Sequence, residues 1–363
     1  MKVPHVRKIA VLRANGLGDL IFALPALEAL RHAYPEAELV WLGRPLHYEF
    51  FSSRPGPVDR VVIVPPSRGV RDEPEGEDEE VLADFFQTMT SEQFDVAVQI
   101  HGGGRFSNRF LKRLGARLTV GLRSAEAIAL DRSVPYIYFQ HEVLRYLEVT
   151  ALLGAEPIKL EPSVCVTQQD LAEVDALLPQ VDQPQVVIHP GAGDSRRRWP
   201  AEKFAEVGDA LANTGARVVV IGTGPERQVV DAVCRAMTSR PIDLAERLSL
   251  GGLIGCLSRS CLVMGNDSGP LHLARTVGAG TLGFYWCGNF INASPITRTR
   301  HRAAISWRLA CPVCGIHCLE GQCPHTESFM DEVSVAEVTA QAFDLIRHDT
   351  MREHLPSMSL GAP

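Results

Sequence analysis

A polar turn between a predicted strand and a predicted helix carries side chains that can bind a phosphate or a sugar. The apolar run 261–264 predicts a buried strand, residues 265–269 turn the chain, and a helical pattern begins at Pro270. Backbone N–H groups at the start of a helix attract anions, because the helix dipole is positive there. Three polar side chains lie within reach of such an anion: Asp267, Ser268 and His272. An ordinary helix cap explains the same residues, so the turn alone leaves both interpretations open.

A second turn, residues 190–200, carries three consecutive arginines. It follows the predicted strand 185–189 and precedes a predicted helix. Guanidinium groups bind phosphate through paired hydrogen bonds, so Arg197 and its neighbours form a candidate anion site, with a solvated basic loop as the alternative. After the next glycine turn, Glu226 is placed either to accept hydrogen bonds from ribose hydroxyls or to be a first-turn acid favoured by the helix dipole.

The first half of the chain contains a related turn, Gly16–Asp19, which places one carboxylate at the start of a helix. The helix dipole stabilises the ionised form of this carboxylate. We therefore predict that Asp19 is unprotonated and able to accept a proton, although a capping aspartate has the same geometry.

The segment 105–123 carries several basic side chains and no acidic one. This composition favours an anionic acceptor, or a membrane surface that bears one. A helix with a solvated basic face is an equally good interpretation.

Four of the nine cysteines lie close together near the end of the chain: Cys311, Cys314, Cys318 and Cys323. The first two have the spacing of metal ligands, the last two do not, and His317 and His325 are interleaved. Bound zinc, reduced structural thiols and a disulfide are the three interpretations. We interpret the other five as small core residues: Cys165, Cys234, Cys256, Cys261 and Cys287.

Alternating strand and helix patterns must position these groups. In the first half we predict strands at 8–13, 38–43, 61–64, 94–100 and 118–121, with helices at 20–32, 81–90, 105–114 and 141–153. After a linker at 154–162, strands at 185–189, 217–221, 261–264 and 281–284 follow, with helices that include 201–213 and 332–348. This alternation predicts two tandem α/β domains with parallel sheets. The glycine-rich turns follow strands, at the edge where such sheets bind ligands, so two facing sets of turns would form an interdomain cleft.

Composition excludes several classes of protein. The chain has 363 residues, of which 45% are hydrophobic, and a formal net charge of -7, which argues against disorder and against a nucleic-acid binder. We see no signal peptide and no apolar run of about 20 residues, so we expect a cytoplasmic protein.

Together, the motifs resemble those of the family 9 glycosyltransferases, which include the ADP-heptose:lipopolysaccharide heptosyltransferases. The resemblance rests on Arg13-x-x-Gly16-x-Gly18-Asp19, His189-Pro190-Gly191 with Arg197-Arg198-Trp199-Pro200, Gly224-Pro225-Glu226, and Asp267-Ser268-Gly269-x-x-His272-Leu273-Ala274. It implies the GT-B fold: an acceptor-binding Rossmann-like domain at 1–155, a nucleotide-sugar-binding one at 165–330, and a C-terminal helix and tail at 331–363. It also implies metal-independent transfer with inversion at the anomeric carbon.

The resemblance further implies roles for single residues, with Asp19 as the catalytic base. The implied donor-binding residues are Gly191, Arg197, Arg198, Glu226, Asp267, Ser268, Gly269 and His272. The implied acceptor-binding residues are Asn15, Gly18, His101, Arg105 and Arg109. The chain departs from the family at Arg197, where lysine is usual, at Ser268, where threonine is usual, and in lacking paired threonines after Gly191.

We therefore expect an inverting transferase that moves a heptose-like sugar from ADP-heptose, or another nucleotide-diphosphate donor, to a lipopolysaccharide core or related anionic glycan. No cofactor is expected for catalysis, and a structural zinc is one interpretation of the cysteines. We expect no nucleic-acid partner, and peripheral contact with the cytoplasmic face of the inner membrane is compatible with such an acceptor. The alternatives are a GT-B-type sugar-nucleotide epimerase and a non-catalytic sugar-nucleotide-binding protein.

Overall fold

The computed structural model describes residues 2–74, 76–318, 321 and 323–353, which form two compact units, Met1–Cys165 and Val166–Pro363. Each unit contains one six-stranded sheet, and its neighbouring strands pair in parallel. The central strands are buried except for Lys8 at the start of β1, as expected where helices cover both faces of a parallel sheet. The predicted α/β architecture of two tandem Rossmann-like sheets is thus confirmed.

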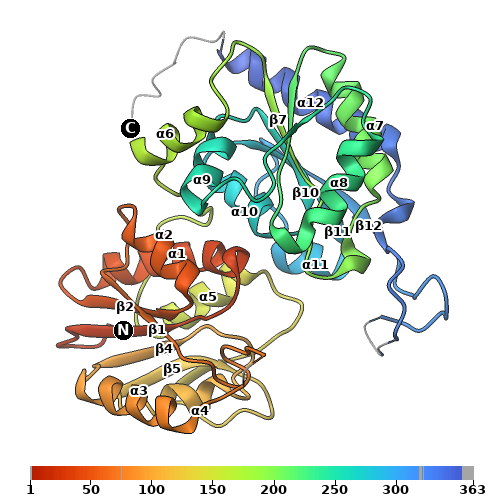
Figure 1. The fold of residues 1–363 in the computed structure, drawn as a ribbon. Coiled ribbons are helices and arrows are strands. Elements are labelled where there is room, and N and C mark those ends of the chain that lie inside the picture. The colour runs from red at the N-terminus through yellow and green to blue at the C-terminus, as the bar shows by residue number, and fades with distance from the viewer. Residues whose placement is uncertain (1, 75, 319–320, 322, 354–363) are drawn as a thin grey trace, which may run out of the picture. The chain divides into compact units, whose positions relative to one another are not determined.

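The first unit has the strand order β3-β2-β1-β4-β5-β6. Its strands are β1 (Lys8–Leu12), β2 (Glu38–Gly43), β3 (Arg60–Ile63), β4 (Val96–Gln99), β5 (Leu118–Arg123) and β6 (Arg132–Pro135). Its helices are α1 (Leu17–Ala33), α2 (Pro45–Ser52), α3 (Glu79–Ser91), α4 (Ser107–Lys112) and α5 (Glu142–Ala151). Figure 1 shows α1, α2 and α5 on one face of this sheet and α3 and α4 on the other.

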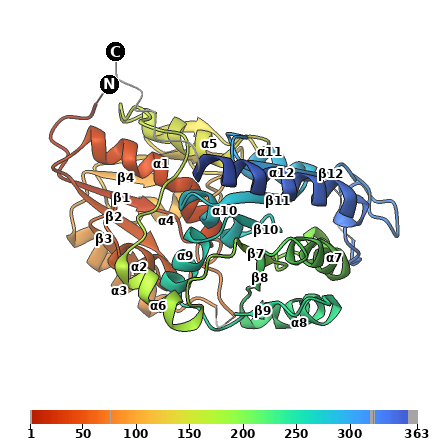
Figure 2. The same cartoon turned by 90° about the horizontal axis from the view of Figure 1, so that it is seen from above.

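The second unit has the strand order β12-β11-β10-β7-β8-β9. Its strands are β7 (Gln185–His189), β8 (Arg217–Val220), β9 (Ile242–Asp243), β10 (Leu262–Asn266), β11 (Gly280–Trp286) and β12 (His301–Ser306). Its helices are α6 (Gln168–Leu177), α7 (Ala201–Ala212), α8 (Arg227–Ala236), α9 (Leu250–Ser258), α10 (Gly269–Thr276), α11 (Cys287–Ala293) and α12 (Val335–Glu353), with 3-10 turns at Ser195–Arg197, Gly224–Glu226 and Met330–Glu332. Figure 2 shows α12 running along this sheet.

Trp199 fixes the arginine-rich turn to the core of the second unit. Its side chain is fully buried, and its ring stacks on that of Phe284 with the centroids 4.5 Å apart. The indole N–H donates a hydrogen bond to the carbonyl of Val333, 3.1 Å away, just before α12. A large buried aromatic side chain with a satisfied N–H is a strong anchor, so the three arginines before it project from a fixed point.

Most predicted elements are present, with ends shifted by a few residues, but several short ones were not identified. These are α2, β6, α6, β9, α9, α11 and β12. The helix α9 was not predicted because its glycines lower the helix propensity of this segment. They are there because α6 lies very close: a Cβ on Gly255 would be 2.3 Å from the carbonyl oxygen of Asp170.

Two further predictions concern the burial of the cysteines and the possibility of a membrane-spanning helix. Cys165 is exposed, so its interpretation as a core residue is wrong, whereas Cys256 and Cys287 are buried. Among the described residues, no helix is both long and apolar enough to span a bilayer.

Candidate active site

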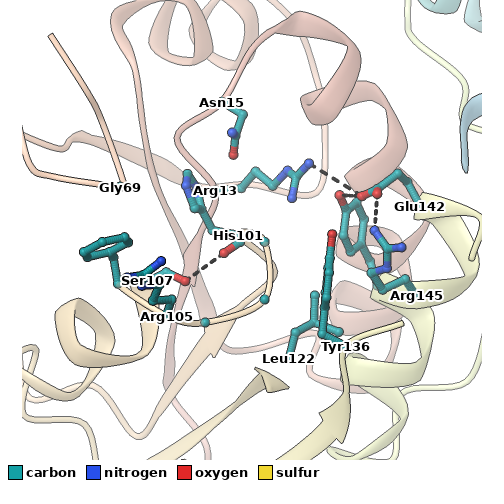
Figure 3. A pocket seen from close by; sticks show the side chains of 15 residues that line it. Arg13, Asn15, Gly69, His101, Arg105, Ser107, Leu122, Tyr136, Glu142 and Arg145 are labelled. Carbon is teal, nitrogen blue, oxygen red and sulfur yellow. Dashed lines mark hydrogen bonds and ion pairs between the residues drawn. The ribbon is translucent and has the colours of Figure 1, made fainter. Parts of the chain in front are cut away.

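In the first unit, polar groups meet where the strand order reverses. The strands β1 and β4 are neighbours in the sheet, and the chain leaves them toward opposite edges. Parallel sheets bind ligands at the carboxyl ends of such strands. A cavity of about 250 Å³ lies there, and it is drawn in Figure 3. Its lining includes Arg13 and Asn15 after β1, His101 and Arg105 after β4, and Tyr136, Glu142 and Arg145 around the start of α5.

Arg13 is the central charge of this site. Its guanidinium is buried and donates hydrogen bonds to the carbonyl of Ile100 and to the carboxylate of Asp19. It also lies 4.7 Å from the centre of the Tyr146 ring, a favourable position for a cation. Arg13 therefore joins the end of β1 to the start of α1 and to α5.

Asp19 occupies the first turn of α1 and is not in the cavity lining itself. Its carboxylate accepts a hydrogen bond from the Gly16 N–H at 3.1 Å as well as from Arg13, and about a third of the side chain, 36%, is exposed. Burial raises the pKa of Asp19, but the guanidinium of Arg13 and the Gly16 N–H more than offset this, so the pKa lies below its ordinary value of 3.8. Asp19 is thus ionised, as a general base must be. Its role as the base stays a prediction.

His101 is neutral at the end of β4. Its Nδ1 accepts a hydrogen bond from the Ala14 N–H at 3.1 Å, so this nitrogen carries no proton. Burial and the nearby charge of Arg13 lower the pKa of His101 to about 3. The neutral ring orients the backbone between β1 and Asn15.

Glu142, Arg145 and Tyr146 of α5 were not identified from the sequence, although they complete the site. The guanidinium of Arg145 and the hydroxyl of Tyr146 both donate to the Glu142 carboxylate, which lies 3.6 Å from Arg13. Figure 3 shows Arg13 and Arg145 converging on Glu142. Burial raises the pKa of Glu142 above its ordinary value, and the two arginines lower it only in part. An acid in the first turn of a helix was the available signal, but it also fits a simple dipole contact.

The structure brings together only some of the predicted acceptor residues. Asn15, His101 and Arg105 line the cavity, whereas Gly18 lies within α1 and Arg109 is exposed on α4, both outside the lining. The Oδ1 atom of Asn15 is buried and has no hydrogen-bond partner among the described residues. Such an acceptor is costly unless something pairs with it, so Asn15 is suited to bind a hydroxyl group.

In the second unit, the equivalent reversal lies between β7 and β10. His189 ends β7, and its two ring nitrogens lie 3.0 Å from Oγ of Ser268 and 3.3 Å from Oε2 of Glu226. The same Glu226 oxygen accepts hydrogen bonds from the Thr223 N–H and hydroxyl, both at 2.9 Å. Burial raises the pKa of Glu226, but His189 and Thr223 outweigh it and lower the pKa to about 2. The turns after β7, β8 and β10, which were predicted to bind the donor, therefore meet at His189. This residue belongs to one of the motifs that carry the family resemblance, but no role was predicted for it.

Gly191 must lack a side chain because Glu226 occupies the space beside it. A Cβ on Gly191 would lie 1.9 Å from Oε1 of Glu226, far inside van der Waals contact. Any larger residue would displace the Glu226 carboxylate. The turn after β7 and the turn after β8 thus fit together through this one glycine.

Arg197 and Asp267 form the charged part of the second site. The guanidinium of Arg197 donates to Oδ2 of Asp267 at 3.3 Å, and Nε2 of His272 lies 3.0 Å from Oδ1 of the same carboxylate. His272 in turn interacts through Nδ1 with Arg275. Because arginine only donates, Nδ1 accepts and Nε2 carries the proton. This chain of four side chains holds Asp267 at the start of α10, next to Ser268 and Gly269.

The side chains of Arg198 and Asn266 make hydrogen bonds within the turn. The guanidinium of Arg198 donates two hydrogen bonds to the carbonyl of Ala192, at 3.0 and 2.7 Å. The side chain of Asn266, fully buried at the end of β10, accepts from the Trp199 N–H and donates to the carbonyl of Pro190. Arg198 therefore keeps its predicted place beside the site, with its charge used within the turn.

A group of potential metal ligands is present, but its membership differs from the prediction. The potential ligand atoms of Cys311, Cys314, Cys323 and His325 all lie within 4.8 Å of one another, so this set can hold a metal. Cys318 is outside the set and packs against the core of the second unit, which corrects the predicted four-cysteine site. Nδ1 of His325 is buried without a hydrogen-bond partner among the described residues, as expected of a nitrogen available to a metal. Three thiols and one imidazole are a common ligand set for zinc.

Comparison with known proteins gives consistent matches. The sequence model of glycosyltransferase family 9 (heptosyltransferase) matches residues 82–311. The chain is 20% identical to the lipopolysaccharide core heptosyltransferase OpsX of Haemophilus influenzae over 296 residues, which cover 80% of this chain and 82% of the relative. The crystal structure of a family 9 glycosyl transferase from Veillonella parvula covers 96% of this chain and 99% of its own, with a TM-score of 0.79 and 19% identity. The E. coli heptosyltransferase WaaC with ADP covers 95% and 99%, with a TM-score of 0.67 and 17% identity. The two parallel sheets thus match those of GT-B heptosyltransferases.

Proposed function

This chain belongs to glycosyltransferase family 9 and is therefore a glycosyltransferase, and from this premise we propose that it transfers heptose from ADP-heptose to a lipopolysaccharide core or a related anionic glycan. The names of the relatives support this choice of substrates, since OpsX acts on the lipopolysaccharide core and WaaC has been crystallised with ADP. The observation that carries the proposal is the pair of sites at the two strand reversals. The site in the first unit contains an ionised carboxylate, Asp19. The site in the second unit contains Arg197, which donates a hydrogen bond to Asp267 just before α10.

Asp19 is the general base of the proposed reaction. Inverting transfer requires a group that takes the proton of the acceptor hydroxyl while its oxygen attacks the anomeric carbon, as the bond from that carbon to the diphosphate breaks. Arg13 keeps Asp19 ionised and fixes its orientation. The Glu142 carboxylate, 3.6 Å from Arg13, is a second counter-charge for this guanidinium, in addition to Asp19.

The second unit holds the donor and stabilises the leaving diphosphate. The backbone N–H groups at the start of α10 and the guanidinium of Arg197 are suited to the charge that develops on the diphosphate oxygens. Arg197 is paired with Asp267, which presets its position. Glu226, already ionised, is available to accept hydrogen bonds from ribose hydroxyls.

The cavity of the first unit binds the acceptor sugar. Asn15 offers an unpaired oxygen to a hydroxyl group, and Arg105, with 67% of its side chain exposed, offers a charge to an anionic substituent. We also propose that the protein is cytoplasmic and meets a lipid-anchored acceptor at the inner membrane surface. The two compact units correspond in this proposal to an acceptor-binding and a donor-binding domain.

Zinc is the metal that we propose for Cys311, Cys314, Cys323 and His325, in a structural role. A closed set of four protein ligands leaves no open position for substrate. Zinc bound there would hold the surrounding segment together, and catalysis would proceed without metal participation. Iron is the alternative metal for a sulfur-rich tetrahedral set.

The test is donor binding followed by product analysis. Thermal unfolding is measured with ADP-heptose, ADP, UDP-glucose and GDP-mannose, because a ligand at 100 times its Kd stabilises by about 2.7 kcal/mol. ADP-heptose is then incubated with and without heptose-deficient lipopolysaccharide. Release of ADP only with the acceptor, together with a heptosylated product, supports the proposal. Turnover of the donor without any acceptor identifies an epimerase, and binding without turnover identifies a non-catalytic sugar-nucleotide-binding protein.

A further inference from the structure

The segment 307–329 connects the metal-binding group to the donor site. It begins directly after β12 and ends before the 3-10 turn at Met330, and it contains all four potential ligands. In sequence it lies more than a hundred residues after the arginine-rich turn. The contacts at its end nevertheless reach that turn directly.

We propose that a metal bound by Cys311, Cys314, Cys323 and His325 holds the arginine-rich turn in its diphosphate-binding position, so that metal loading controls donor affinity. This inference rests on the proposed role of Arg197 and deepens it. The metal acts through position only and does not touch the substrate.

Two hydrogen bonds carry the connection. The Phe329 N–H donates to the carbonyl of Arg196 at 2.7 Å, and the Ser328 hydroxyl donates to the carbonyl of Arg198 at 2.5 Å. The Arg196 guanidinium also lies 5.3 Å from the centre of the Phe329 ring. Residues 328 and 329 therefore hold the backbone on both sides of Arg197.

The metal ligands divide the segment into an anchored and an unanchored part. Cys311 is buried, Cys318 packs against the core of the second unit, and the carbonyl of Arg308 accepts a hydrogen bond from the Trp286 indole N–H at 2.7 Å. In contrast, residues 323–327 make no main-chain hydrogen bond to another element in the part of the chain that the structure describes. A metal shared by Cys311 and His325 would tie this second stretch to the core, three residues before Ser328.

Loss of the metal should therefore free the stretch that supports the turn. Binding energy at a structural metal site is folding energy for the segment that supplies its ligands. Without it, the hydrogen bonds of Ser328 and Phe329 to the turn would be weakened, although the Phe329 ring stays buried in the core and its carbonyl accepts from the Ser306 hydroxyl at 2.6 Å. Donor binding would then have to order the Arg197 guanidinium, and this loss of conformational freedom lowers the affinity for the donor.

The first experiment compares Cys314→Ser with Cys165→Ser, an exposed cysteine of the first unit, in the full-length protein. Metal content is measured by mass spectrometry, ADP affinity by calorimetry, and protection of the Phe329 amide by hydrogen exchange. We expect Cys314→Ser to lose its metal, to show reduced protection of the Phe329 amide, and to bind ADP about tenfold more weakly, the loss of roughly one hydrogen bond to a charged group. Cys165→Ser should match the wild type in all three measurements.

A second variant keeps the ligands and breaks the connection. Ser328→Ala removes the hydroxyl that donates to Arg198, and it should retain the metal while ADP binding weakens. In Arg197→Ala protein, the further change Cys314→Ser should weaken ADP binding little more, because both changes act through the same guanidinium. If Cys314→Ser does not fold, Ser328→Ala, alone and combined with Arg197→Ala, still decides the question.

The outcomes separate this inference from the proposed function. Wild-type protein that binds no ADP would overturn the proposed donor. Protein that purifies without metal and takes up neither Zn²⁺ nor Fe²⁺, or that binds ADP equally well with and without metal, would overturn the inference alone. Additive effects of Cys314→Ser and Arg197→Ala would also overturn it.

Discussion

The buried guanidinium of Arg13 donates a hydrogen bond to the carboxylate of Asp19 at the start of α1. Burial alone would raise the pKa of this carboxylate, but Arg13 and the Gly16 N–H bring it below its ordinary value of 3.8. The base form of Asp19 is therefore present at neutral pH and in mild acid, and it is lost only as the pH falls through the lowered pKa.

The pH dependence of activity follows from this pair. We expect kcat/KM not to depend on the protonation of Asp19 or His101 between about pH 5 and about pH 8, because the pKa of Asp19 lies below 3.8 and that of His101 is about 3, and we expect Glu142, whose pKa burial raises, to account for any acidic limb. Initial rates are measured across this range, with thermal unfolding at each pH as a control for stability. An activity limb with a midpoint near pH 6 that persists in folded Glu142→Gln protein would contradict this assignment.

Glu226 should stabilise the second unit in a pH-dependent manner. Its pKa is about 2 in the folded protein and 4.5 as a free side chain, a difference worth about 3 kcal/mol at neutral pH. Because the folded pKa is the lower one, this contribution is full above about pH 5 and disappears as the pH falls toward 2. Chemical denaturation should show Glu226→Gln destabilised at pH 7 and equal to the wild type near pH 2. The exposed Glu156→Gln is the control, and a loss of the same size in both variants would reject the assignment.

Arg197 should contribute to donor affinity through its charge. Arg197→Ala should weaken ADP binding by about 1.5–3 kcal/mol, the range for hydrogen bonds to charged groups. Arg235→Ala removes an exposed arginine of α8 from the same unit and should leave Kd unchanged. Calorimetry with ADP provides the comparison, and equal Kd values for the two variants would return Arg197 to the solvated-loop interpretation.

The metal site predicts different results for two neighbouring cysteines. Protein purified without added metal should contain one zinc per chain. Cys314→Ser should lose it, whereas Cys318→Ser should keep it, because Cys318 packs against the core and His325 takes its place among the ligands. Retention of zinc in Cys314→Ser, or its loss in Cys318→Ser, would show that the ligand set is different.

The sequence was informative where chemistry and local structure coincide. The turns at Asp267 and Asp19 were both recognised because a glycine-rich stretch between a strand and a helix is compatible with few structures other than a tight turn. Glu142 was missed because its role depends on α5 bringing it within 3.6 Å of Arg13, more than a hundred residues away. No local pattern contains such a distance.

The same limit explains the errors at the cysteines and at α9. The four cysteines were grouped because they lie close together in sequence, but Cys318 packs against the core of the second unit and His325 joins the other three. The glycines of α9 lower helix propensity, yet they are required for the close approach of α6. In both cases tertiary packing decided against the local preference.

The most direct test of the proposed mechanism is the turnover number of Asp19→Asn with ADP-heptose and a heptose-deficient lipopolysaccharide. Asparagine keeps the shape and caps a helix about as well as aspartate, so ADP affinity should change little, whereas Tm should fall because Arg13 keeps only Glu142 as a counter-charge. Asp59→Asn, which alters a surface carboxylate paired with Arg31, is the matched control. We expect kcat to fall by about 10²–10⁴-fold in Asp19→Asn only, the usual contribution of a general base. Turnover close to that of the wild type would contradict the account and leave Asp19 as a helix cap.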